Sequence, residues 1–90
     1  MAINFKVSIH RNDDNLHLKL MGDFDGSSAC ELINVLKANA HSASMVFIHT
    51  NRLNRIHPFG RHVFCNNLNN MDGQSLKFVF TGGKASQLEP

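Results

Sequence analysis

The chain has 90 residues, 42% of them apolar, and a formal net charge of +2. A chain of this length is expected to fold as one domain over residues 1–90, and its small charge argues against nucleic acid as a partner, since nucleic-acid-binding proteins usually carry a strong basic stripe. The amino terminus has no basic-then-apolar signal pattern, and no apolar run approaches the ~18 residues of a membrane span, so we expect a cytosolic protein without such a span.

The first elements expected along the chain are two strands joined as an antiparallel hairpin. Apolar and polar residues alternate over Asn4–His10 and over Asn15–Met21, which is the period of strands with one buried face. The polar stretch 11–15 between them is typical of a turn.

A helix is expected next, followed by a central strand. Ser28 and Glu31 have the spacing of a capping box, with Asp25 as the other candidate cap. Met45–His49 is an apolar run ending in polar residues, which is typical of a strand that is covered on both faces and has parallel neighbours. The apolar residues of the expected helix recur every three or four positions: Ala29, Leu32, Ile33, Leu36 and Ala40.

The second half of the chain predicts another helix and another strand. Pro58 suits the first turn of a helix, where its missing N–H costs nothing, and this helix should end within Asn66–Asn70. Leu76–Phe80 is the last clear strand, before a turn and a short helical segment. The second helix has apolar pairs four residues apart: Phe59 with Val63, and Phe64 with Leu68.

The predicted order β-β-α-β-α-β indicates an α/β fold with a mixed sheet of about four strands and helices packed on it. Because crossovers are right-handed, the loops Gly22–Ser27 and Thr50–Pro58 should open at one edge, where α/β proteins usually place their sites. Cys30 and Cys65 lie among apolar residues without a partner at metal-ligand or redox spacing, so both are expected to be buried thiols.

Two segments together resemble the STAS family, which contains the anti-sigma-factor antagonists. Leu20–Leu32 resembles the family's strand, Gly-x-Leu/Phe-Asp loop and first helix, and Val46–Gly60 aligns without a gap to its apolar strand, loop and Asp-Ser-Ser-Gly switch. With the matching strand Leu76–Gly82, the resemblance covers about residues 5–82. It implies a STAS-like α/β fold and a non-catalytic regulatory role through protein–protein interaction.

The chain departs from the family at three positions. The family usually has Asp where this chain has His49 and His57, and a phosphorylatable Ser or Thr where it has Pro58. Proline has no hydroxyl, so the phosphorylation that switches partners in the family is not expected at this position. A surface that is acidic in relatives should be basic or neutral in this chain, because it carries the two histidines and the neighbouring arginines. This difference implies an acidic or phosphorylated partner.

The start of the second helix is the expected partner-binding site, because the exposed N–H groups and the dipole of a helix start favour an anion. Phe59 or Ile56 is the expected apolar anchor, and Gly60 is expected to allow a partner to approach closely. The expected binding residues are Asp25, Arg55, Ile56, His57, Pro58, Phe59, Gly60 and Arg61.

Three alternatives compete with this interpretation. The same basic end of the second helix is also suited to a nucleotide, another small anion or a nucleic acid. Asp23 and Asp25 match the nucleophile motif of haloacid-dehalogenase phosphatases, but the chain lacks the other parts of that site, so no enzyme activity is expected. None of the six histidines pair at metal-ligand spacing on a helix, so neither a metal nor a cofactor is expected.

Overall fold

The chain begins with the expected antiparallel hairpin, although its turn is tighter than predicted. The computed structural model describes residues 4–40, 43–70 and 76–89. Strand β1 (Lys6–Asn12) pairs with strand β2 (Asn15–Phe24), and the pairing extends to Asn12 opposite Asn15. Only two residues turn the chain, and the first of them, Asp13, has a φ of 57°, a conformation that aspartate tolerates better than most residues.

The four strands form one mixed sheet in the order β1-β2-β3-β4. Strand β3 (Met45–Ile56) runs parallel to β2, and strand β4 (Lys77–Thr81) runs parallel to β3. Helix α1 (Gly26–Asn39) connects β2 to β3, and helix α2 (Pro58–Asn70) lies between β3 and β4 in the chain. A short helix α3 (Ala85–Leu88) follows β4. The predicted α/β class, strand directions and helix order are therefore confirmed.

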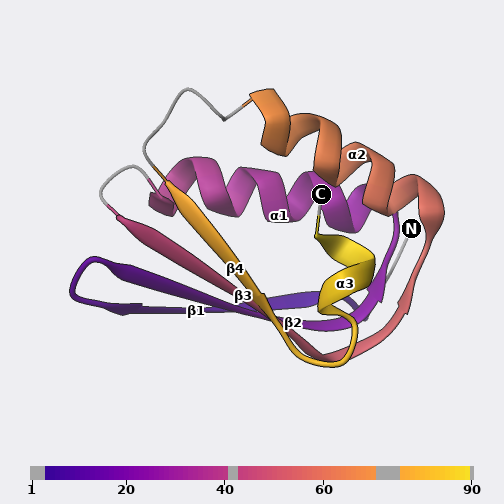
Figure 1. Ribbon diagram of the computed structural model, residues 1–90. Helices are drawn as coiled ribbons and strands as arrows, with labels where there is room; N and C mark the ends of the chain where they lie inside the picture. The colour runs from indigo at the N-terminus through magenta and orange to yellow at the C-terminus, as the bar shows by residue number, and fades with distance from the viewer. Residues whose placement is uncertain (1–3, 41–42, 71–75, 90) are drawn as a thin grey trace.

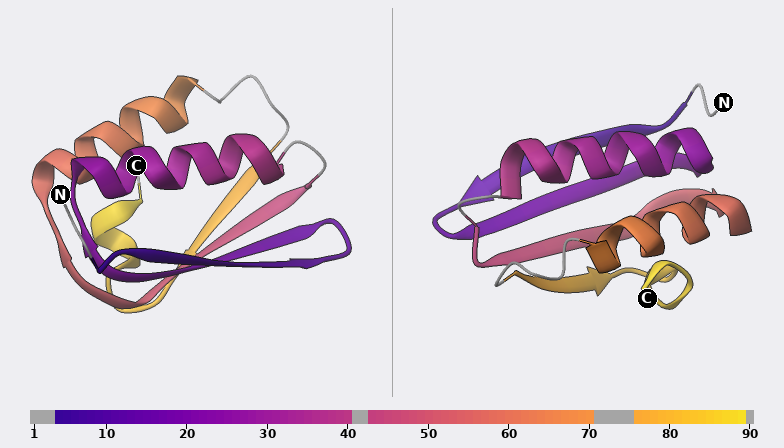
Figure 2. Two further views of the ribbon diagram at one scale, coloured as in Figure 1. Left: turned by 180° about the vertical axis from the view of Figure 1, so that it is seen from behind. Right: turned by 90° about the horizontal axis from the view of Figure 1, so that it is seen from above.

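The hydrophobic core lies between the sheet and helices α1 and α2. Figure 1 and both views in Figure 2 show these helices side by side over one face of the sheet, with α3 beside them, and no helix of the described residues lies on the other face. The predicted apolar stripe of α1 is confirmed, because all five of its residues are buried. The sheet contributes alternate residues of β2 and β3 to the same core: Leu16, Leu18 and Leu20, and Val46 and Ile48.

The sheet has one covered face, so the prediction that Met45–His49 is covered on both faces is wrong. Val46 and Ile48 are fully buried, whereas Phe47 and His49 are only partly buried. Because Phe47 is apolar, the segment has no polar residue at the alternate position and its sequence predicts burial on both faces. The side chain instead belongs to the uncovered face.

Both predicted loops are shorter than expected, because β2 continues to Phe24, α1 begins at Gly26 and residues 50–56 continue strand β3. Leu53 pairs with Gly22 and Ile56 with Phe24, so β3 stays hydrogen-bonded to β2 along its whole length. Register shifts after Lys19 and after Gly22 mark irregularities in this pairing. They break the strict alternation from which a strand would be predicted.

Two smaller predictions about α1 also fail. The capping box led by Ser28 is wrong, because the other candidate cap, Asp25, is the N-cap and the helix begins at Gly26. Cys30 is exposed rather than buried, because it lies on the solvent side of the helix, next to but outside the stripe formed by Ala29, Leu32 and Ile33. Cys65 is partly buried.

Candidate functional site

The starts of α1 and α2 lie side by side, because β2 and β3 are parallel neighbours that end at the same edge of the sheet. The last pair in their register is Phe24 with Ile56, and the next residue, His57, donates its backbone N–H to the Phe24 carbonyl at 2.9 Å. The two chain segments therefore enter their helices together. Figure 2 shows these two helix starts at one end of the molecule.

Asp25 fixes the start of α1. Its Oδ1 accepts hydrogen bonds from the Ser28 backbone N–H at 2.9 Å, from Ser27 Oγ at 2.9 Å and from Ser28 Oγ at 3.0 Å. The bond from the Ser28 N–H, assisted by the two hydroxyls, holds the pKa of Asp25 well below its usual value, although partial desolvation opposes the shift. Asp25 is thus a fully engaged structural carboxylate at the edge of the site.

Gly60 is buried, and the close approach that it allows is to the chain's own backbone rather than to a partner. A Cβ atom at this position would lie 2.7 Å from the carbonyl carbon and oxygen of Asp25 and 2.8 Å from the Phe24 oxygen. The first turn of α2 can therefore pack directly against the chain entering α1. This contact corrects the role expected for Gly60.

Phe59 is the most exposed large apolar side chain of the described residues, with 67% of its surface accessible. Its ring lies against Gly26 at the start of α1, where an added Cβ would lie 2.8 Å from Phe59 Cε2. One part of the ring is therefore held by the neighbouring helix, and the rest faces solvent. Such a ring is an apolar surface element with a defined position.

The charged residues expected at this site separate into two groups. Arg55 is exposed and His57 is half-buried beside the exposed Pro58. Arg61 instead reaches the carboxyl-terminal segment, where its Nε donates to the Gln87 carbonyl at 2.7 Å and its Nη2 to the Glu89 carbonyl at 3.3 Å. Arg61 thus binds the chain's own carbonyl groups, so Arg55 and His57 are the basic side chains that remain available to a partner at this end.

His49 does not lie at this end of the molecule, contrary to expectation. It faces the uncovered side of the sheet, where its Nδ1 is 2.6 Å from Thr81 Oγ1 and its Nε2 is 3.0 Å from His17 Nδ1. Partial burial, with the nearby His17 and Lys19, lowers the pKa of His49. The residues that remain together at the start of α2 are Arg55, Ile56, His57, Pro58 and Phe59, here called the α2 docking surface.

The phosphatase alternative finds no support in this geometry. The carboxylate of Asp25 is committed to the cap of α1, and Asp23 belongs to strand β2 rather than to a loop. In the described part of the chain, no group of three or more His, Cys, Asp or Glu side chains is placed to hold a metal ion. None of the helices in residues 4–40, 43–70 and 76–89 is long and apolar enough to cross a membrane.

The uncovered face of the sheet was not predicted from the sequence. His17 stacks on Phe47 with ring centres 4.6 Å apart, and His49 meets His17 edge to edge. The available signal was the alternation itself, because His17 and Lys19 lie between the leucines of β2, and Phe47 and His49 have the same phase in β3.

Comparisons with known proteins identify the fold. No family model matches the chain, and no curated protein matches it in sequence. The crystal structure of an antisigma-factor antagonist, a STAS domain from Rhodobacter sphaeroides, matches with a TM-score of 0.73 and 12% identity over 96% of each chain. The anti-sigma factor antagonist SpoIIAA in its unphosphorylated form matches with a TM-score of 0.67 and 8% identity, over 94% of this chain and 80% of SpoIIAA.

A third likeness is to part of a larger protein. Mglu in its L-glutamate binding form matches with a TM-score of 0.76 and 13% identity, over 93% of this chain but only 28% of Mglu. The chain thus spans little more than a quarter of that structure. At these identities the likeness concerns the fold alone. The chain has a STAS-like fold, as its sequence predicted.

Proposed function

We propose that this chain is a non-catalytic protein-interaction module of a bacterial cytosolic regulatory system, and that it binds another regulatory protein through the α2 docking surface. The likeness to two anti-sigma-factor antagonists over nearly the whole chain supports a regulatory STAS-like module. The nature of the partner and the way in which it binds are inferred from the residues of the surface.

The observation that carries the proposal is the position of Phe59. Its side chain is 67% exposed, yet its ring is held against Gly26 at the junction of two helix starts. Contact of a large aromatic side chain with water is unfavourable, so covering the ring with a partner stabilises the complex. Because the ring is already positioned, little conformational entropy would be lost on binding.

Charge around Phe59 favours an acidic or phosphorylated partner. Arg55 is exposed on one side, His57 lies next to the helix start, and the first turn of α2 contains no acidic residue. The dipole of α2 adds positive electrostatic potential at this helix start. An acidic side chain or phosphate of the partner would be attracted to this end, while Phe59 would fill an apolar pocket.

Regulation of this surface differs from that of a phosphorylated switch. The segment 54–60 contains no hydroxyl group, and Pro58 stands where the resemblance places the acceptor. Phosphorylation of Ser or Thr cannot occur within this segment. Binding would therefore be constitutive, or controlled by modification of the partner.

The proposal is tested by capture of cytosolic proteins on the immobilised chain, followed by affinity measurement with the captured partner. Phe59→Ala is expected to weaken binding roughly 30-fold or more, the effect of removing a central aromatic anchor. Ile9→Ala is the matched control, because Ile9, on β1, is the other large apolar residue among those described whose side chain is exposed, at 48%. Equal affinities for Phe59→Ala and wild type would show that the docking surface lies elsewhere.

The expected partner charge has its own test. Arg55→Glu and His57→Asp each place a negative charge in the α2 docking surface and are expected to weaken binding of an acidic partner at low salt, mainly by slowing association. Arg55→Gln separates loss of the positive charge from introduction of a negative one. Stronger binding by Arg55→Glu would show that the partner presents a basic surface instead.

A further inference from the structure

The uncovered face of the sheet is a second surface that the proposed function does not use. Leu16, Leu18 and Leu20 point into the core, so the residues between them point to the opposite side. The strand register then places their neighbours on that same side. This surface, here called the open sheet face, consists of Lys6, Ser8, His10, His17, Lys19, Met21, Met45, Phe47, His49, Arg52, Lys77, Val79 and Thr81.

Positive charge is concentrated on the open sheet face. It includes three lysines on three different strands, Lys6, Lys19 and Lys77, with Arg52 beyond the first irregularity of β3. None of the residues that make up the face is acidic, and the nearest strand carboxylate, that of Asp23, lies beside Arg55 at the end of β2. The small net charge of +2 conceals this segregation, which appears only when the strands are in register.

Flat rings cross the centre of the same face. His17 stacks on Phe47 with planes within 5° of parallel, and the coplanar His49 ring meets His17 with a nitrogen–nitrogen distance of 3.0 Å. Thr81 fixes the other side of the His49 ring. On β1, the His10 ring centre is 6.3 Å from that of His17. The rings are thus held in place by one another and by Thr81, and they are incompletely buried.

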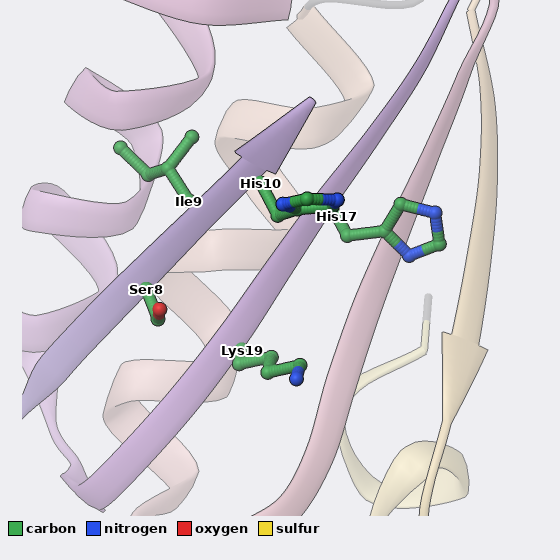
Figure 3. Close-up of a pocket in the computed structure, with 5 residues that line it drawn as sticks. All are labelled: Ser8, Ile9, His10, His17 and Lys19. Carbon is green, nitrogen blue, oxygen red and sulfur yellow. The ribbon is translucent and has the colours of Figure 1, made fainter. Parts of the chain in front are cut away.

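A hollow of about 390 Å³ lies next to these rings on β1 and β2. Ser8 is paired with Lys19, and His10 with His17, so a hydroxyl, an ammonium group and two imidazoles line it together with Ile9. Figure 3 shows these four side chains, with Ile9 pointing away from them. Each of the four can donate a hydrogen bond to an anionic oxygen.

We propose that the open sheet face binds single-stranded nucleic acid, with bases stacked on the exposed His10 ring and the partly exposed rings beside it, and phosphates beside the lysines. Single strands are held in general by flat aromatic platforms combined with a cationic surface, and both features coincide here. A second copy of the chain is a less suitable occupant, because lysines of the two copies would come together and repel each other. An acidic protein would satisfy the charges but would leave the ring platform without a function.

The test is fluorescence anisotropy with labelled single strands of about 12 nucleotides, in RNA and DNA forms, at about 50 mM salt. Binding is expected to weaken steeply with salt, and Lys19→Gln with Lys77→Gln should reduce the magnitude of the logarithmic salt slope by about 1.4, or ~0.7 for each lysine. The double variant Lys37→Gln with Lys84→Gln removes the same charge outside the sheet, and it should leave the slope unchanged. The RNA and DNA arms show which sugar is preferred.

The ring platform is tested separately from the charge. Phe47→Leu is expected to weaken binding roughly 5- to 150-fold, the effect of losing one stacked base. Its fold is verified by circular dichroism, and His10→Ala, at an exposed position, serves if Phe47→Leu does not fold. Phe59→Ala should leave oligonucleotide affinity unchanged, so this proposal and the proposed docking of a protein can fail independently.

Several outcomes would overturn the proposal. One is absence of binding to either single strand at low salt. Another is an equal loss of affinity in the Lys19→Gln, Lys77→Gln variant and in the Lys37→Gln, Lys84→Gln control. Poly-glutamate that binds as tightly as the oligonucleotides, with no effect of Phe47→Leu or His10→Ala, would identify an acidic protein as the occupant instead. A dimer in solution that Phe47→Leu disrupts, and that the Lys19→Gln, Lys77→Gln variant strengthens by removing repulsion between the copies, would identify a second copy instead.

Discussion

At the scale of single residues, the Asp25 carboxylate holds the first turn of α1, because it accepts the Ser28 N–H and two serine hydroxyls. Asp25→Ala leaves that N–H without its cap and should lower the free energy of unfolding by about 1 kcal/mol. Asp23→Ala is the matched control, since this carboxylate caps no helix. Urea unfolding of both variants near neutral pH measures the difference, and a larger loss in Asp23→Ala would contradict the assignment.

The Asp25 carboxylate also makes the free energy of unfolding depend on pH. Because the Ser28 N–H lowers the pKa of Asp25 in the folded chain, the stabilisation is present above the unfolded pKa of ~3.9 and is lost as pH falls toward the lower folded value. The stability difference between wild type and Asp25→Asn should therefore shrink below about pH 4. A difference that stays constant from pH 5 to about pH 2 would refute this linkage.

His49 should give a second pH dependence, nearer to neutrality. Partial burial and the neighbouring His17 and Lys19 lower its pKa, so the unfolded chain binds this proton more readily than the folded one. Stability is then expected to fall as pH decreases below ~6.5, by at most about 1.4 kcal/mol per pH unit. His49→Gln should flatten this part of the profile, whereas His62→Gln, at an exposed position on α2, should not. Thermal unfolding at a series of pH values compares the two slopes.

At the scale of elements, the contact between α2 and the chain entering α1 depends on the absence of a side chain at Gly60. Gly60→Ala would place a methyl group 2.7 Å from the Asp25 carbonyl, and backbone on both sides prevents easy adjustment. We expect a loss of about 1–3 kcal/mol in the free energy of unfolding. Gly83→Ala is the control, because its added methyl meets nothing within 4 Å. Similar denaturation midpoints for the two variants would argue against this packing.

The sequence predicted the elements with a regular apolar period and missed those without one. The stripe of α1 and the leucines of β2 repeat without interruption, and both elements were predicted. In β3, Leu53 and Ile56 lie three residues apart among Asn and Arg, because the pairing with β2 is irregular there, and this part was predicted as a loop. Local pattern does not contain the register of a partner strand.

Prediction of the candidate site was limited in a similar way. Pro58 identified the start of α2, and its neighbour Phe59 was recognised as a candidate anchor. The packing of Gly60 on Asp25, and the bonds from Arg61 to carbonyls near the carboxyl terminus, join residues more than 20 positions apart in the sequence. No spacing rule reports such contacts. His49 was assigned to the wrong end of the molecule because β3 was expected to end there.

At the scale of the whole molecule, the two proposed surfaces lie on different structural parts. The α2 docking surface is formed at one edge of the sheet, where two helices begin and an apolar ring is exposed. The open sheet face is built from all four strands, on the side away from the helices, as Figure 1 shows. Occupation of one leaves most of the other accessible. A protein and an anionic polymer could therefore be bound together.

The short helix α3 ties the carboxyl-terminal segment to the core, and its loss should affect the molecule beyond the segment itself. Leu88 is fully buried, Cys65 Sγ lies 3.7 Å from the Leu88 carbonyl, and Arg61 binds the carbonyls on either side. Leu88→Ala removes most of this anchor and should lower the free energy of unfolding by about 2–5 kcal/mol. It should also uncover Cys65, since α3 would detach from α2 more often than the whole chain unfolds.

Thiol labelling distinguishes this local detachment from global unfolding. In a Cys30→Ser background, which removes the exposed thiol, Cys65 is the one remaining cysteine of the sequence and reports on α3 alone. We expect faster labelling of Cys65 in Leu88→Ala than in wild type, at denaturant concentrations where circular dichroism still shows a folded chain. Gln87→Ala changes an exposed side chain of the same helix and should not alter the rate. If Cys65 labelling in Leu88→Ala accelerates only in step with loss of the circular dichroism signal, α3 and the core unfold as a single cooperative unit.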